Sequence, residues 1–273
     1  MTERSTILVD ERPSDGFGPP RVLITNDDGI DSPGLRALVS AFADSSCDVV
    51  VAAPMGDSSG SGTAIGRFDI GRGVEMRRAD LDGVPAFMVA GPPGLAVTAA
   101  ALGAFGAAPD LVVSGINAGI NTGHSIIHSG TVGAALTGRT FGSRGLAVSL
   151  AASDPWQWDT AVSVAVSAAQ WLLRRRRHRS CLNVNVPALT LGEVRGVRWA
   201  DLDEFGAFRV ATADVEQSRL QFELSGSGAG IDPASDTALC LGGYVAMTLL
   251  SGIEPQPAPE EPMDVWIPLE SAG

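Results

Sequence analysis

The sequence of 273 residues contains no lysine, so all 19 of its basic residues are arginines. The chain therefore has neither the phosphate-binding lysine of a Walker loop nor a lysine that forms a Schiff base with a carbonyl substrate. Aspartate and glutamate number 31, which gives a formal net charge of −12. This acidity argues against a nucleic-acid polymer as a partner. A small phosphorylated substrate is compatible with it, provided that a bound cation reverses the local charge.

Cysteines and long apolar runs are scarce as well. Cys47, Cys181 and Cys240 lie far apart in apolar surroundings, and we expect reduced core residues rather than a disulfide or a zinc site. No stretch approaches the roughly 18 unbroken apolar residues of a membrane span. The N-terminus shows no charged and then apolar signal pattern. The sequence therefore predicts a soluble, cytoplasmic protein without a membrane partner.

The segment at residues 21–30 organises the rest of the chain. Its apolar run at 22–25 has the pattern of a strand buried on both faces, and Asp27 and Asp28 follow directly. Ligands of open α/β sheets bind at this carboxyl end of the strands. Two adjacent carboxylates there repel each other and lose hydration, which a hard divalent cation would offset. Asn-Asp-Asp-Gly is also an ordinary turn sequence, so this pattern alone leaves a turn without a ligand open.

Strand, glycine-rich loop and helix then recur in order. A helix begins at Pro33, and a hairpin over 74–78 and 84–89 turns at Asp82-Gly83. This order predicts an α/β fold with a Rossmann-like, doubly wound, mostly parallel sheet. Further strands are expected at 48–53, 111–113, 146–150 and 182–187, and helices at 92–105, 132–141 and 158–173.

The sequence pattern changes near residue 190. Short alternating segments predict antiparallel hairpins, followed by a short helix or turn and a returning strand. The expected segments are 194–199, 205–212, 219–224, 232–239 and 244–250. We accordingly divide the chain into a flexible leader at 1–20, an α/β core with the metal site at 21–190, a hairpin-rich oligomerisation or lid region at 191–253, and a Pro/Glu-rich tail at 254–273.

Oxygen donors follow three of the predicted strands. Asp27 and Asp28 come from the first loop, the Ser59 hydroxyl from the second and the Asn117 carbonyl from the third. Hard oxygen ligands without histidine or cysteine favour Mg²⁺, Mn²⁺ or Ca²⁺ over zinc. Four protein ligands would leave two octahedral positions for a phosphate oxygen and a water, as metal-assisted phosphate ester hydrolysis requires.

A phosphate site is predicted beside these donors. Ser129, Gly130 and Thr131 stand at a predicted helix N-terminus, where amides and hydroxyls attract anions. Asn121 is a further candidate donor, and Asn26, which precedes the two carboxylates, is assigned to the same group. Each of these residues could by itself be only a structural cap. The prediction of a phosphate site therefore rests on their joint placement at the ends of successive strands.

The glycine-rich loop after the second strand also invites a dinucleotide hypothesis. Gly60 and Gly62 followed by Gly66 resemble a stretched G-x-G-x-x-G. The last spacing is one residue too long, the loop follows the second strand, and no acidic residue ends a later strand at the right distance. A hydroxyl- or amide-rich wall facing the first loop fits better.

Several motifs together resemble the SurE (survival protein E) family of nucleotidases. They are Asn26-Asp-Asp-Gly29 with Ser32-Pro-Gly34, Ala53-Pro54 with Ser59-Gly60, Ser114-Gly-Ile-Asn-Ala-Gly-Ile-Asn-Thr-Gly123, Ser129-Gly-Thr-Val-Gly-Ala-Ala135, Leu182-Asn-Val-Asn-Val-Pro187 and Gly243-Tyr-Val245. The resemblance implies a Rossmann-like core, dimers or tetramers built by an exchanged C-terminal hairpin or tail, and divalent-metal-dependent removal of phosphate from nucleoside monophosphates. By position, it places the family's metal ligands on Asp27, Asp28, Ser59 and Asn117.

The chain also departs from the family pattern around an intact ligand set. The residues that differ are Met55, Gly56, Leu95, His124, His128 and Thr137. We therefore expect an active phosphatase for a nucleotide or a specialised phosphorylated metabolite, with one Mg²⁺ or Mn²⁺ ion and a metal-activated water as the attacking group. Asp27 and Asp28 are its central residues, and His128 is a candidate general acid or only a filler of a tyrosine-sized position. The alternative is a nucleotide-binding protein that has lost turnover.

Overall fold

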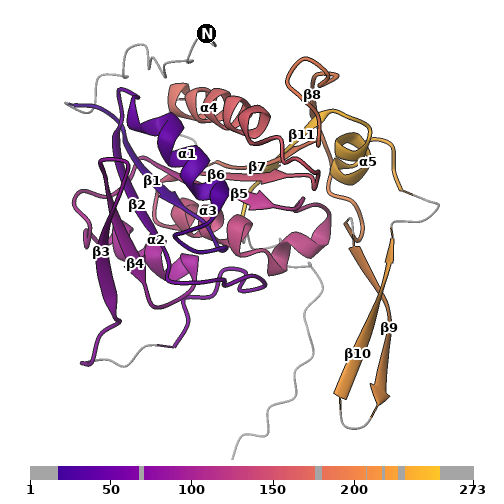
Figure 1. Cartoon of the computed structure of the whole chain (residues 1–273), viewed down its shortest axis with the longest axis horizontal. Helices are drawn as coiled ribbons and strands as arrows, with labels where there is room; N and C mark the ends of the chain where they lie inside the picture. The colour runs from indigo at the N-terminus through magenta and orange to yellow at the C-terminus, as the bar shows by residue number, and fades with distance from the viewer. Residues whose placement is uncertain are drawn as a thin grey trace, which may run out of the picture.

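The computed structural model describes residues 18–67, 71–175, 180–206, 208–216, 219–226 and 231–252. The predicted leader, apart from residues 18–20, and the predicted tail lie outside these residues. Within them, nine strands form one sheet in the order β3-β4-β2-β1-β5-β6-β7-β11-β8 (Figure 1). The strands in this order are β3 (Met76–Leu81), β4 (Val84–Val89), β2 (Asp48–Pro54), β1 (Arg21–Thr25), β5 (Leu111–Ala118), β6 (Arg144–Leu150), β7 (Cys181–Val186), β11 (Val245–Leu250) and β8 (Val197–Trp199).

The six strands from β4 to β7 in this order are all parallel to one another, and antiparallel pairing begins only with β3 and β11, so the predicted fold class is confirmed. β1 lies at the centre between β2 and β5, and Val22, Leu23 and Ile24 are fully buried. Helices cover both faces of these strands, which is why their apolar runs are uninterrupted. The carboxyl end of β1 thus opens into the middle of the sheet edge.

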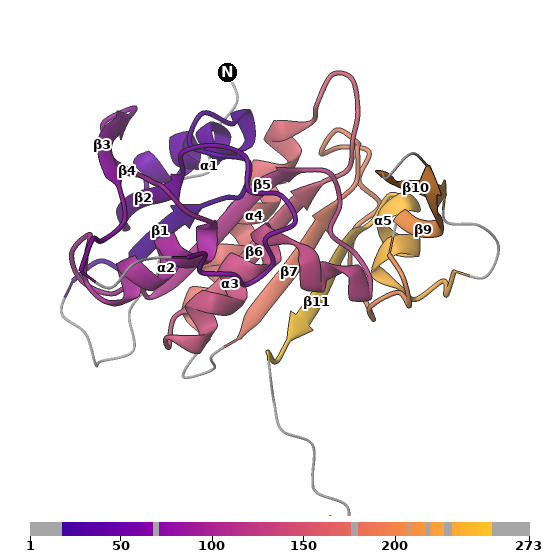
Figure 2. The same cartoon turned by 90° about the horizontal axis from the view of Figure 1, so that it is seen from below.

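Helices α1 (Pro33–Ala43) and α4 (Trp158–Arg174) pack on one face of the sheet. Helices α2 (Pro93–Ala101) and α3 (Gly130–Thr140) cover the other face (Figure 2). α2 is shorter than predicted because Gly103 adopts a left-handed conformation (φ 89°) just past its end, which is typical of a helix stop. No helix among the described residues is long and apolar enough to cross a membrane.

The region after β7 differs in part from expectation. β9 (Phe208–Glu216) and β10 (Arg219–Gly226) form the predicted antiparallel hairpin, which projects from the body (Figure 1). β11 returns to the main sheet antiparallel to β7, and α5 (Asp236–Leu241) precedes it. The prediction of a hairpin at 194–199 is wrong, because β8 pairs in parallel with β11 at the sheet edge. The alternation of apolar and polar residues at 194–199 indicated a strand, but it carried no information about which strand it pairs with.

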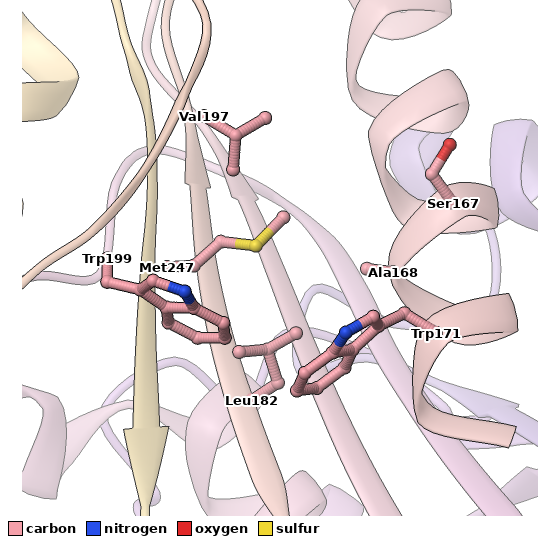
Figure 3. Close-up of a pocket in the computed structure, with 7 residues that line it drawn as sticks. All are labelled: Ser167, Ala168, Trp171, Leu182, Val197, Trp199 and Met247. Carbon is pink, nitrogen blue, oxygen red and sulfur yellow. The ribbon is translucent and has the colours of Figure 1, made fainter. Parts of the chain in front are cut away.

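An apolar groove of about 300 Å³ lies at this edge of the sheet (Figure 3). Its lining comes from α4, β7, β8 and β11 and consists of Ser167, Ala168, Trp171, Leu182, Val197, Trp199 and Met247. The rings of Trp171 and Trp199 lie 5.6 Å apart, and Trp199 remains 58% exposed. None of the four elements carries a predicted metal ligand, so the groove is separate from the candidate site.

Candidate active site

Asn26 braces the turn that connects β1 with α1. Its side-chain amide donates hydrogen bonds to the Gly29 carbonyl (3.0 Å) and to the Ser32 hydroxyl (2.7 Å). The Ser32 hydroxyl also accepts from the Leu35 N–H and so caps α1. The Asn26 carbonyl oxygen is buried without a hydrogen-bond partner. The structure thus gives Asn26 a role in holding the acidic turn, and its phosphate role stays a prediction.

Asp27 is 4% exposed and faces the first turn of α3. The Thr131 hydroxyl donates to Asp27 Oδ1 at 2.5 Å, and the Thr131 N–H donates to the same carboxylate. Burial raises the pKa of Asp27, while the hydrogen bonds from Thr131 oppose the rise. The N-terminus of α3 therefore holds a carboxylate of the first loop, and Thr131 serves Asp27 in addition to any phosphate.

Gly130 makes this contact possible because it has no side chain. A Cβ atom at Gly130 would lie 2.7 Å from Asp27 Oδ2 and 2.7 Å from Ser61 Oγ. The Ser61 hydroxyl is therefore a neighbour of the Asp27 carboxylate, and it is buried without a hydrogen-bond partner. Ser61 could not be predicted as a site residue, since nothing in the sequence of the glycine- and serine-rich loop distinguishes it from its neighbours.

Asp28 is half-buried and lies against the end of β5, where the Ala118 N–H donates to its carboxylate. Burial, followed by the charges of Asp27 and Asp57, raises the pKa of Asp28 to about 6. β5 extends to Ala118, five residues beyond the predicted end, so Asn117 belongs to the strand itself. The Asn117 amide nitrogen donates to the Gly119 carbonyl at 2.8 Å, which fixes the side chain and leaves its carbonyl oxygen as the acceptor.

The loop that carries Ser59 is tied to Asp27 by its backbone, since the Ser58 N–H donates to the Asp27 carbonyl at 2.7 Å. Asp57 Oδ1 accepts from the Ser59 N–H (2.8 Å) and hydroxyl (2.6 Å), which lowers the pKa of Asp57. The Ser59 oxygen keeps lone pairs for a further partner. Sequence reasoning missed Asp57, the third carboxylate near the pair, although an Asp in a polar loop commonly accepts from the backbone N–H two residues further on.

The predicted phosphate donors divide into two groups. Ser129 caps α3 by accepting from the Val132 N–H at 3.1 Å and thus lies in the same helix turn as Gly130 and Thr131. Asn121 instead joins the neighbouring strands, and its amide donates to the Ser149 hydroxyl at 2.8 Å. The residues of the first group therefore lie beside Asp27, whereas the Asn121 side chain is hydrogen-bonded to Ser149 on β6.

The two histidines named in the sequence analysis, His124 and His128, lie on the 3-10 helix η1 (His124–His128), which the sequence did not predict. Both side chains are exposed. Nδ1 of His124 lies 3.2 Å from the Glu204 carbonyl oxygen, and the His128 backbone carbonyl accepts from the Gly62 N–H at 3.0 Å. η1 thus joins the serine-rich loop to the start of α3, and the role of His128 as an acid stays a prediction.

The donor set suits a hard divalent cation. Two neighbouring carboxylates in a buried setting carry raised pKa values, and the buried oxygens of Ser61 and Asn26 have no hydrogen-bond partner. No group of three or more His, Cys, Asp or Glu side chains suited to a metal occurs in the described part of the chain. Hydroxyl and amide oxygens would therefore have to complete the shell, as Mg²⁺ and Mn²⁺ accept. The residues fit such an ion.

Manganese is expected to raise the melting temperature more at about pH 7.5 than at about pH 5. The folded-state pKa of Asp28 is raised to about 6. The contribution of Asp28 to the stability of the metal-free fold is therefore full below its unfolded-state pKa and is lost as pH rises through about 6. A divalent cation binds the ionised carboxylate and restores this contribution. Thermal melts with MnCl₂ or EDTA test this, and Asp28→Asn should show little shift at either pH. Equal shifts of the unmodified protein at both pH values would contradict it.

Comparison with known proteins identifies the family. Residues 22–206 match the family model described as survival protein SurE. A protein of Chloroflexus aggregans named 5'-nucleotidase SurE is 42% identical over 180 residues, 65% of this chain and 70% of that one. A protein of Anaeromyxobacter sp. with the same name is 39% identical over 239 residues, 84% and 89% of the two chains. The crystal structure of the SurE protein from Aquifex aeolicus superposes with a TM-score of 0.72 at 29% identity, covering 85% and 93%. The chain therefore belongs to the SurE family.

Proposed function

We propose that this protein is a divalent-metal-dependent phosphomonoesterase that removes phosphate from nucleoside monophosphates or a related phosphorylated metabolite. The relatives named 5'-nucleotidase SurE support a nucleotidase or phosphatase function. The observation that carries the proposal is the pair Asp27 and Asp28 at the carboxyl end of the central strand, where the N-terminus of α3 holds Asp27 and the end of β5 holds Asp28. A cytoplasmic location and a homodimer or homotetramer formed through the C-terminal region belong to the proposal as well.

Asp27, Asp28, Ser59 and Asn117 would hold one Mg²⁺ or Mn²⁺ ion. When bound, such an ion neutralises phosphate charge and activates a water at neutral pH. Thr131 fixes the orientation of Asp27 through its hydroxyl and N–H. Ser129, Gly130 and Thr131 begin α3, whose positive end favours a phosphate beside the carboxylates.

The leaving group needs a proton when the phosphate ester bond breaks. His128 is the candidate donor, because histidine is the commonest general acid in enzymes and the residue directly precedes Ser129, the cap of α3. Asn121 and Asn26 complete the proposed phosphate surroundings. In the structure, Asn26 Nδ2 already donates two hydrogen bonds within the protein and Asn121 Nδ2 donates one. Asn26 would therefore have to rearrange before it donates to a phosphate, whereas Asn121 keeps a second N–H.

A phosphate-release screen over nucleoside monophosphates and sugar phosphates tests the proposal. We expect release from at least one nucleoside monophosphate in the presence of MnCl₂ or MgCl₂ and its loss in EDTA. Release that persists in EDTA would refute the metal dependence. Nucleotide binding without release for any substrate and metal would instead favour the nucleotide-binding alternative, in line with the altered residues at Met55, Gly56, Leu95 and Thr137.

A further inference from the structure

Residues 119–129, here called the site loop, connect the end of β5 with the cap of α3. The loop therefore separates Asn117 from Ser129, two residues of the proposed site. At one end, the Asn121 carbonyl accepts from the side-chain amides of Asn183 (2.9 Å) and Asn185 (2.8 Å) on β7. The middle of the loop needs a separate anchor, because it leaves the sheet there.

Asp236, at the start of α5, is that anchor. It is fully buried, and its two carboxylate oxygens accept from the Gly123 N–H at 2.9 and 3.1 Å. Oδ1 also accepts from the N–H groups of Asp203 (3.0 Å) and Thr237 (2.8 Å). One carboxylate thus joins three chain segments, because Asp236 lies 113 positions from Gly123 and 33 positions from Asp203. A buried carboxylate is unfavourable unless its oxygens accept hydrogen bonds, and these three N–H groups supply them.

The same place is where the β9–β10 hairpin leaves the body. Gly206 stands just before β9 and packs backbone to backbone on the site loop, and a Cβ atom at Gly206 would lie 2.3 Å from the Thr122 carbonyl oxygen. A Cβ atom at Gly123 would lie 2.3 Å from the Gly206 nitrogen. Gly123 and Gly206 have φ values of 64° and 93°, which favour glycine. The His124 N–H donates to the Asp203 carbonyl at 3.0 Å, which closes the contact.

We propose that Asp236 is a positioning residue, and that its contact with Gly123, together with the glycine contact at Gly206, lets the root of the β9–β10 hairpin set the position of the site loop. The consequence for catalysis rests on the proposed phosphatase function. The positioning of the site loop does not depend on that function, because it concerns only how firmly residues 119–129 are held in place. A partner that holds the hairpin would act on the site through this contact.

Asp236→Asn tests the proposal selectively. The carboxamide keeps one oxygen for Asp203 and Thr237, but its NH₂ group replaces Oδ2, the closer acceptor of the Gly123 N–H. Donor then meets donor at that contact, and only the 3.1 Å bond to Oδ1 is left. We expect hydrogen exchange of the site loop to rise about tenfold or more. We expect kcat to fall by about tenfold to a hundredfold, while Mn²⁺ affinity changes by less than about threefold, because the four proposed ligands lie outside the loop. Asp232→Asn is the matched control, since Asp232 is exposed and accepts from Ala234 on the same segment.

A second variant and a measurement on the unmodified protein complete the test. Gly206→Ala pushes the hairpin root off the loop without touching the carboxylate, and we expect the same exchange and kinetic pattern. In the unmodified protein, the Gly123 amide should exchange as slowly as core amides. Rapid exchange of that amide, or unchanged loop exchange in both variants, would overturn the proposal. A protein that releases no phosphate from any substrate would refute the phosphatase function, and the exchange results would still decide the positioning role.

Discussion

Asp27→Asn is expected to lower kcat/KM for phosphate release by about a hundredfold to a thousandfold. Asparagine has nearly the same shape and keeps an oxygen that accepts from the Thr131 hydroxyl. The substitution therefore removes the charge and leaves the fold intact. A neutral side chain binds a divalent cation more weakly and no longer offsets its charge next to the phosphate. The measurement is steady-state phosphate release across a range of Mn²⁺ concentrations.

Asp31→Asn is the matched control, because Asp31 lies four residues further along in the chain and its side chain is 83% exposed. That variant should retain full activity. The melting temperature of metal-free Asp27→Asn should equal or exceed that of the unmodified protein, since burial disfavours the charged form of Asp27. Full phosphate release by Asp27→Asn with Mn²⁺ present would exclude Asp27 from the metal site.

The core of the fold could be predicted because its signals are local. Residues 22–25 form an apolar run that only a strand buried on both faces explains, and Ser32 with Pro33 marks the start of α1. The placement of Asp27 and Asp28 followed from the general rule that polar residues at the ends of parallel strands meet at one sheet edge. The sequence therefore defined both the fold class and the centre of the candidate site.

The rest depends on which distant segments come together. β8 is three residues long, and its pairing with β11 is set by how the chain returns after the hairpin, which no short pattern encodes. Ser61 lies beside Asp27 only because Gly130 lets the two segments approach each other. Asp236 joins Gly123 across 113 positions of sequence, and an Asp in the first turn of a short helix looks like an ordinary cap.

Thr131 shows a different limit of prediction from sequence, because its position is local but its partner is not. Its position at the start of α3 predicted a donor for phosphate. In the structure, its hydroxyl and N–H both donate to the Asp27 carboxylate. The sequence indicated a donor at this helix end but not which acceptor it meets, because Asp27 is 104 positions away. Donor capacity is a local property, whereas the choice of acceptor is set by the contact between the first turn of α3 and the loop that follows β1.

The second large effect is expected for Gly130→Ala, which we predict to lower kcat/KM by about a hundredfold and to destabilise the fold by about 1–3 kcal/mol. The added Cβ would lie 2.7 Å from both Cβ and Oδ2 of Asp27. Asp27 cannot rotate away without losing the 2.5 Å hydrogen bond from Thr131, the next residue of the same helix. The methyl group therefore displaces the carboxylate itself.

Gly56→Ala is the control for the same chemical change in a neighbouring loop. A Cβ atom at Gly56 would meet no atom within 4 Å, and the residue has no positive φ. We expect near-normal activity and melting temperature there. Kinetics and thermal melts of both variants separate the effects. If Gly130→Ala lost only stability and kept its kcat/KM, the position of the Asp27 carboxylate would not limit the reaction, and the contact between α3 and the acidic turn would be one of packing alone.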